Sequence, residues 1–126
     1  MHMGDWEGKT YQEIERACPE EWHRFWQTPL RFKADNKGET FEELSRRSQI
    51  SIEKIIADHP GESIGIISHR ITIKMIVADL LNISIDDLLD VSPNSVTKIV
   101  VEKNKAILER YSDTSHYELL KEPLKS

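Results

Sequence analysis

The feature that most constrains the fold of this 126-residue chain is a change of hydrophobic period near its centre. Residues 64–67 (Ile-Gly-Ile-Ile) form a short apolar run bounded by Ser63 and Ser68. Such a run between two helical patterns is typical of a strand covered on both faces, as in a parallel sheet. After His69 the apolar residues recur at helical spacing: Ile73, Ile76, Val77, Leu80 and Leu81. The sequence therefore predicts a buried strand that leads directly into an amphipathic helix.

Upstream of this point the sequence predicts helices. Thr10 and Thr40 are each followed three residues later by glutamate, the spacing of a capping box. Pro19 suits the first turn of a further helix. The helix that begins after Thr40 is long and amphipathic, and it is expected to end at His-Pro-Gly, residues 59–61.

Downstream, Ser84 is expected to begin a short helix, and two β-rich runs follow. Residues 95–102 and 106–111 flank Lys-Asn-Lys and are predicted to form an antiparallel pair. The order of elements is then helices, strand, helix and two strands. That order indicates an α/β fold with helices packed on a small sheet.

Composition narrows the classes of function. The length suits one compact domain, and a net charge of −5 argues against binding to duplex nucleic acid. The single cysteine, Cys18, excludes a disulfide framework and favours a reducing cytoplasm. No apolar run reaches membrane-spanning length, so no membrane association is expected. The histidines show no metal-ligand spacing, and no cofactor motif is present, so neither a metal nor a cofactor is predicted.

The junction Ser68-His69-Arg70 contains the candidate functional residues. In open α/β sheets, sites form where strands end and the next helices begin. The free N–H groups of a helix N-terminus attract anions, arginine adds a bidentate donor, and histidine can carry protons or act as a nucleophile. His69 and Arg70 are therefore candidate phosphate-binding residues. The alternative is that His69 only caps the helix.

The aromatic residues of the N-terminal half are expected to be structural. Residues 4–8 (Gly-Asp-Trp-Glu-Gly) are predicted to form a tight turn before a helix, with Trp6 as a core anchor. Trp22, Phe25 and Trp26 share one face of the helix that starts at Pro19. We expect them to lie in the core rather than to form a platform on which a substrate stacks.

In their order and spacing, several segments resemble the motifs of histidine phosphatases of the phosphoglycerate-mutase-like family. Residues 4–8 (GDWEG) resemble the family's "G-x-W-E-G", and residues 38–41 (GETF) resemble "G-E-S/R-F". Residues 61–69 (GESIGIISH) resemble the strand that delivers the second active-site histidine. Residues 94–97 (NSVT) and 113–116 (DTSH) resemble the later "N-x-S-V/I-T" and "D-x-S/A-H" motifs. The similarity spans residues 1–116 and is greatest to broad-specificity and α-ribazole-phosphatase-like enzymes.

The resemblance implies a three-layer α/β/α fold and hydrolysis of phosphomonoesters. In this family a histidine of an N-terminal "R-H-G" motif attacks phosphorus, arginines and the second histidine hold the phosphoryl oxygens, and a carboxylic acid protonates the leaving group. His69 corresponds to the second histidine. The domain is expected to span residues 1–117, with residues 118–126 as a loosely held tail.

Departures from the family pattern shape the expected function. The chain contains no Arg-His-Gly, and no glutamate precedes Gly4 to act as the acid. The glycine expected after the second histidine is Arg70, which would either reinforce phosphate binding or block the pocket. We favour blocking, because glycine at such a position permits close approach. The chain is therefore expected to be N-terminally truncated relative to the family and inactive on its own.

The resemblance also implies a reduced sheet without the N-terminal central strand. An exposed strand edge recruits partners, so a homo-oligomer or pairing with a separate N-terminal segment is expected. Three interpretations follow. The chain is a half-site that becomes active with an Arg-His-Gly segment, a non-catalytic remnant that binds a phosphorylated ligand or a protein, or a truncation product without an independent role.

Overall fold

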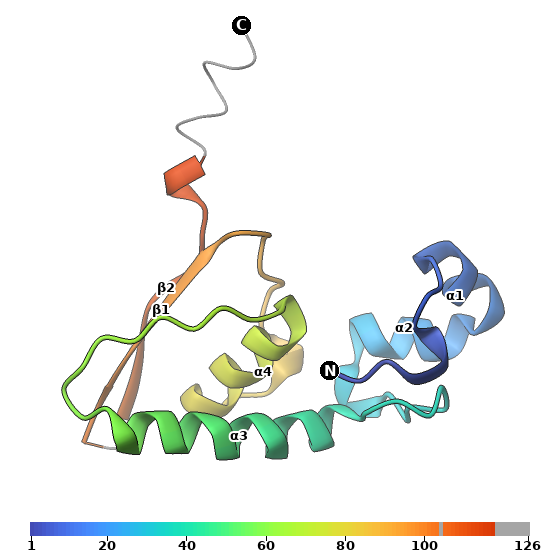
Figure 1. Cartoon of the computed structure of the whole chain (residues 1–126). Coiled ribbons are helices and arrows are strands. Elements are labelled where there is room, and N and C mark those ends of the chain that lie inside the picture. The colour runs from blue at the N-terminus through green and yellow to red at the C-terminus, as the bar shows by residue number, and fades with distance from the viewer. Residues whose placement is uncertain (104, 118–126) are drawn as a thin grey trace, which may run out of the picture.

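The computed structural model describes residues 1–103 and 105–117 and shows an elongated α/β arrangement (Figure 1). Its α-helices are α1 (Tyr11–Ala17), α2 (Pro19–Gln27), α3 (Phe41–Asp58) and α4 (Arg70–Leu81), and its strands are β1 (Val96–Glu102) and β2 (Lys105–Asp113). Short 3-10 helices lie at η1 (Gly4–Trp6), η2 (Pro29–Arg31) and η3 (Ile85–Asp87). The mixed α/β class predicted from the sequence is confirmed.

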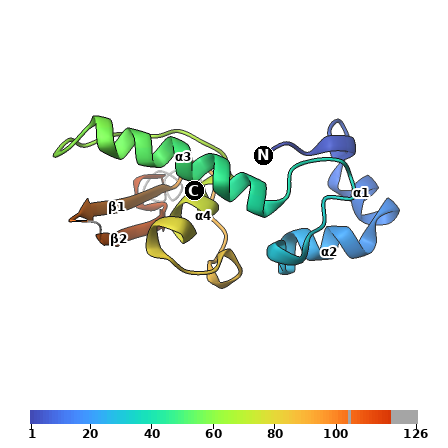
Figure 2. The same ribbon diagram turned by 90° about the horizontal axis from the view of Figure 1, so that it is seen from below.

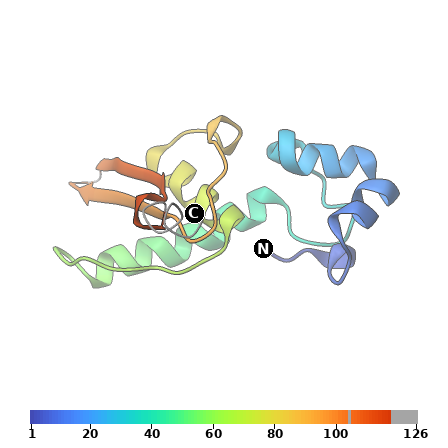
Figure 3. The ribbon, with the colours of Figure 1, turned by 90° about the horizontal axis from the view of Figure 1, so that it is seen from above.

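The elements gather at two ends of the molecule. Helices α1 and α2 lie at one end, the β1–β2 hairpin lies at the other, and α3 extends beneath α4 toward the hairpin (Figures 1 and 2). Helix α4 contacts both α3 and β2. Seen from above, the segment between α3 and α4 runs back along α3 (Figure 3). The predicted tail, residues 118–126, lies outside the described residues.

The helix starts predicted from capping signals are confirmed. The Thr10 hydroxyl accepts from the Glu13 N–H at 3.1 Å, and the Glu13 carboxylate accepts from the Thr10 N–H at 3.0 Å. The Thr40 hydroxyl likewise accepts from the Glu43 N–H at 3.1 Å. Pro19 is the first residue of α2. These local hydrogen bonds satisfy N–H groups that a helix leaves free at its start.

The predicted antiparallel pair is also confirmed. Strands β1 and β2 pair from Val96 opposite Asp113 to Glu102 opposite Lys105. The register shifts on either side of Lys98, so the hairpin is irregular near its open end. Within the described residues these two strands form the whole sheet.

The buried strand predicted at residues 64–67 is wrong. These residues lie outside regular secondary structure, and no backbone hydrogen bond joins residues 63–68 to the other described residues. Ile64 and Ile66 are exposed, and the relative exposure of Ile67 reaches 102%. A strand requires a partner that accepts and donates hydrogen bonds along its length. An apolar run favours an extended backbone, but it does not provide the neighbouring strand with which that backbone would pair.

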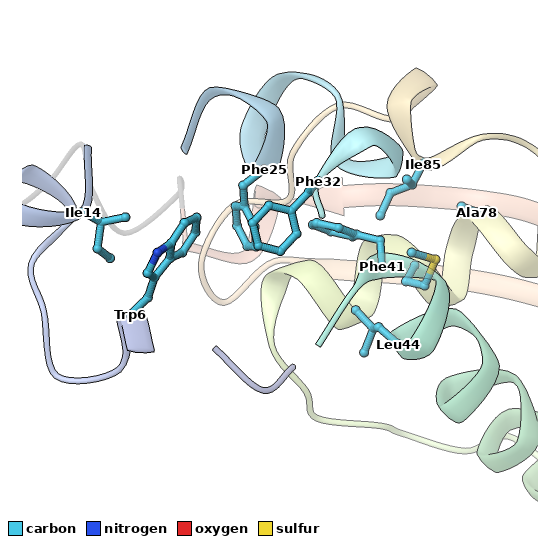
Figure 4. Close-up of a cluster of buried hydrophobic side chains, with 9 residues drawn as sticks. Trp6, Ile14, Phe25, Phe32, Phe41, Leu44, Ala78 and Ile85 are labelled. Carbon is cyan, nitrogen blue, oxygen red and sulfur yellow. The ribbon is translucent and has the colours of Figure 1, made fainter. Parts of the chain in front are cut away.

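The core lies where the N-terminal helices meet α3 and α4 (Figure 4). Its buried residues are Trp6, Ile14, Phe25, Phe32, Phe41, Leu44, Met75, Ala78 and Ile85. The Trp6 ring lies 5.5 Å from that of Phe25 and 5.4 Å from that of Phe32, between centroids. The prediction that Trp6 anchors the core is confirmed. Trp22 and Trp26 are partly buried and pack against this cluster.

Two of the motif segments meet at the N-terminus. A Cβ atom on Gly4, which has φ of +56°, would lie 2.2 Å from the backbone oxygen of Asn36. A Cβ atom on Gly38 would lie 2.6 Å from the backbone oxygen of His2. The buried Asn36 amide donates to the Met3 oxygen at 2.9 Å. Only glycines allow this approach, so the two segments lock the first residues in place.

No helix among the described residues is both long and apolar enough to cross a bilayer.

Candidate functional site

His69 stands at the N-cap of α4. Its backbone is extended, with φ −105° and ψ 153°, and its carbonyl accepts from the Ile73 N–H at 2.9 Å. Its side chain is exposed and makes no capping hydrogen bond. His69 thus occupies the N-cap position, as the alternative predicts, but its imidazole gives the helix no capping hydrogen bond. The imidazole is accessible to a ligand. The residues that precede it do not form a buried strand.

The start of α4 has the electrostatics of an anion site. Unlike α1 and α3, this helix has no side-chain cap. Within the described part of the chain, the backbone N–H groups of Arg70, Ile71 and Thr72 have no hydrogen-bond partner. Free N–H groups and the positive end of the helix dipole favour an anion at this point.

The Arg70 side chain is engaged within the chain. Its Nη1 lies 3.4 Å from a carboxylate oxygen of Asp90, and its guanidinium carbon lies 4.5 Å from the centre of the Trp26 ring. The first contact is an ion pair between half-exposed groups, and the second is a cation–π contact. Arg70 thus links α4 to α2 and to the segment before β1.

Sequence reasoning did not identify Asp90 as part of this site. Its carboxylate accepts from the Val91 N–H at 3.0 Å, in addition to pairing with Arg70. Next to it, the Tyr111 hydroxyl donates to the Leu89 carbonyl. Burial, and to a lesser degree the Asp90 charge, raise the pKa of Tyr111 to about 12. Asp90 could not be identified from the sequence, because its partner Arg70 is distant along the chain and other aspartates lie near it in the sequence.

A cavity between the helices does not include the predicted site. A cavity of about 500 Å³ lies between α3, α4, η2 and η3. Neither His69 nor Arg70 lines it. At its rim the Ser45 hydroxyl donates to the Asp79 carboxylate at 2.9 Å, and burial raises the pKa of Asp79. This arrangement has no cationic side chain in its lining, so it does not suit a phosphate.

Among the described residues, no group of three or more histidine, cysteine, aspartate or glutamate side chains is arranged to hold a metal ion. The groups that His69 and Arg70 bring to the start of α4 are an imidazole, a guanidinium and backbone N–H groups.

Comparison with known proteins gives this arrangement a family context. A profile of the histidine phosphatase superfamily (branch 1) matches residues 1–114. A metal-independent phosphoserine phosphatase from Arabidopsis thaliana is 28% identical over 116 residues, which cover 91% of this chain and 48% of that protein. Phosphoglycerate mutase-like protein 4 from the same plant is 25% identical over 119 residues, covering 93% of this chain and 51% of that protein.

Solved structures show the same likeness. The structure of YhfR from Bacillus stearothermophilus is 30% identical with a TM-score of 0.83, covering 91% of this chain and 58% of that one. A putative α-ribazole-5'-P phosphatase from Escherichia coli is 19% identical with a TM-score of 0.70, covering 88% and 55% of the two chains, and it supports the fold alone. The chain thus spans about half the length of the curated relatives it matches. It belongs to branch 1 of the histidine phosphatase superfamily.

Proposed function

We propose that this chain provides the phosphate-binding half of a histidine phosphatase site, with His69 as a ligand of the phosphoryl oxygens. The observation that carries the proposal is that His69 stands exposed beside the uncapped N–H groups of α4, in a chain whose residues 1–114 match the family profile. The substrate class is a phosphomonoester, in keeping with the named activity of the phosphoserine phosphatase relative. An anion at this point would receive hydrogen bonds from the imidazole and the free amides.

We further propose that the chain alone does not turn over substrate. It contains no Arg-His-Gly, the motif that carries the nucleophile in this family. Loss of the nucleophile from a cooperating catalytic unit costs on the order of a million-fold in rate. Bound phosphate would still meet His69 and the amides, so binding without hydrolysis is the expected behaviour. The half-site becomes active when a segment that carries Arg-His-Gly is supplied.

An aryl phosphate assay tests this proposal in two steps. The chain alone should release no phenol above the buffer rate, and co-expression with a family N-terminal segment carrying Arg-His-Gly should restore turnover. His69→Ala should abolish the restored activity. His59→Ala is the matched control, because His59 is another exposed histidine, 3.6 Å from the Glu62 carboxylate. If the chain alone hydrolyses the aryl phosphate and His69→Ala removes that activity, the proposal that the chain alone is inactive is contradicted. If the restored activity does not change in His69→Ala, the proposal that His69 binds the phosphoryl group is contradicted.

The second candidate is a non-catalytic protein that binds a phosphorylated ligand or another protein. The exposed isoleucines of residues 64–67 favour it, because unpaired apolar segments recruit partners. We propose that this segment mediates homo-oligomerisation or pairing with a separate N-terminal segment. Saturable phosphate binding that persists without turnover, even when Arg-His-Gly is supplied, would select the non-catalytic candidate.

The cellular setting is also a proposal. We infer a cytoplasmic location from the single cysteine, Cys18, which is exposed and has no disulfide partner. The net charge of −5 argues against duplex nucleic acid as the binding partner, and it is compatible with a small phosphorylated ligand held by local cationic groups.

A further inference from the structure

Arg70 stands where the family pattern has glycine, and its contacts point to a specific role. The guanidinium lies 4.5 Å from the centre of the Trp26 ring and 3.4 Å from the Asp90 carboxylate. Asp90 is itself fixed by the Val91 N–H, and the neighbouring Leu89 carbonyl by the Tyr111 hydroxyl. The segment that holds Asp90 is therefore anchored to β2, while Arg70 extends from the start of α4. A long cationic side chain is held from two sides next to His69.

Donors outnumber acceptors at this point. The guanidinium adds a planar fork of N–H donors, whereas Asp90 is the one carboxylate paired with it in the described part of the chain. An excess of donors around one carboxylate favours the arrival of a further oxygen-rich anion.

The strengths of the competing contacts decide whether Arg70 is free to move. The side chains of Arg70 and Asp90 are 37% and 49% exposed, and ion pairs between groups this exposed contribute little. Bidentate hydrogen bonds from arginine to a phosphoryl group are charge-assisted and stronger. Adjacent Cα atoms lie about 3.8 Å apart, so the Arg70 side chain starts beside any anion bound at His69.

We propose that Arg70 is a specificity-determining ligand, withdrawn onto Asp90 and Trp26 in the free protein and drawn to the phosphoryl group bound at His69. This inference rests on the proposed function of His69. Because the anion must compete with the Asp90 carboxylate, the site favours doubly charged phosphomonoesters over singly charged phosphodiesters. The role differs from the blocking role favoured from the sequence.

Titration with inorganic phosphate at constant ionic strength tests the inference on the full chain. Calorimetry gives the affinity, and tryptophan fluorescence follows departure of the guanidinium from the Trp26 ring. Asp90→Asn should tighten phosphate binding by about two- to fivefold, because it removes a weak competitor. Arg70→Ala should weaken binding by about tenfold, with partial rescue in Arg70→Lys. Dimethyl phosphate should bind more weakly than phosphate, and Trp26→Phe should abolish most of the fluorescence change.

Glu109→Gln is the matched control for Asp90→Asn. Its carboxylate is 45% exposed and lies 3.0 Å from Lys98 Nζ in the hairpin, so the substitution changes the net charge equally. It should leave phosphate affinity unchanged. Unchanged or tighter binding by Arg70→Ala, or weaker binding by Asp90→Asn in a folded variant, would overturn the inference. If His69→Ala loses binding while the Arg70 and Asp90 variants match wild type, only this inference fails. If the wild-type chain binds no phosphate, the proposed function itself fails.

Discussion

At the scale of single residues, the partly buried Tyr111 hydroxyl holds the segment next to Asp90. It donates to the Leu89 carbonyl, and burial together with the Asp90 charge raises its pKa to about 12. An unfolded tyrosine titrates near pH 10. Between these two values the folded chain keeps a proton that the unfolded chain loses. The contribution of Tyr111 to the free energy of unfolding is therefore fully present below about pH 10, and it is lost as the pH rises toward 12.

Tyr111→Phe gives a direct prediction. The absorbance titration of tyrosinate in the folded protein should lose its phase at about pH 12. The variant should also be less stable at neutral pH by about 1 kcal/mol, because a hydrogen bond is removed. Chemical denaturation measures the second effect. Tyr11→Phe is the control, since Tyr11 lies on α1 and is 60% exposed. Persistence of the high-pH phase in Tyr111→Phe would contradict the assignment.

The sequence predicted some residues of the candidate site and missed others for a physical reason. His69 was found because the change of hydrophobic period marks the start of a helix locally. Asp90 and Trp26 touch Arg70 only after the chain has folded. Contacts between residues far apart along the chain leave no periodic or spacing signal. The contacts of Arg70 with Asp90 and Trp26 therefore could not be predicted from the sequence.

At the scale of elements, the helix starts divide into capped and uncapped. Thr10 and Thr40 cap α1 and α3, whereas the start of α4 has no side-chain cap. Caps are local, which is why the sequence predicted them and the structure confirms them. The strand predicted at residues 64–67 depended on a partner instead, and it is wrong. Local chemistry decides where a helix begins, but a strand requires another segment.

Thr40→Ala is predicted to destabilise the protein by about 1 kcal/mol, because the Glu43 N–H loses its acceptor. Thermal or urea denaturation measures this loss. Thr40→Ser is the matched control and should retain most of the stability, since its hydroxyl can make the same bond. Equal stability of Thr40→Ala and wild type would show that the cap does not contribute.

At the scale of the whole molecule, a solid aromatic core contrasts with an unpaired apolar segment. The buried cluster around Trp6 and Phe25 joins the N-terminal helices to α3 and α4. Residues 64–67, by contrast, expose their isoleucines and lack backbone partners among the described residues. The relatives extend over about twice the matched length. The chain thus combines a buried aromatic core with an exposed apolar segment at residues 64–67.

Ile67→Lys tests the oligomerisation proposed for this surface. Light scattering on the wild-type chain should show a mass above that of one chain, rising with concentration. A charge at the fully exposed Ile67 should shift the protein toward the monomer. Ile50→Lys is the control, because Ile50 is an exposed isoleucine of α3. A strictly monomeric wild-type chain at high concentration would contradict the proposal.

Equilibrium binding of inorganic phosphate by wild type, His69→Ala and His59→Ala tests the central claim most directly. We expect saturable binding by wild type and His59→Ala. His69→Ala should bind at least about tenfold more weakly, because one charge-assisted hydrogen bond is lost. Circular dichroism would confirm that all three are folded. Equal phosphate affinity in His69→Ala and wild type would contradict the account.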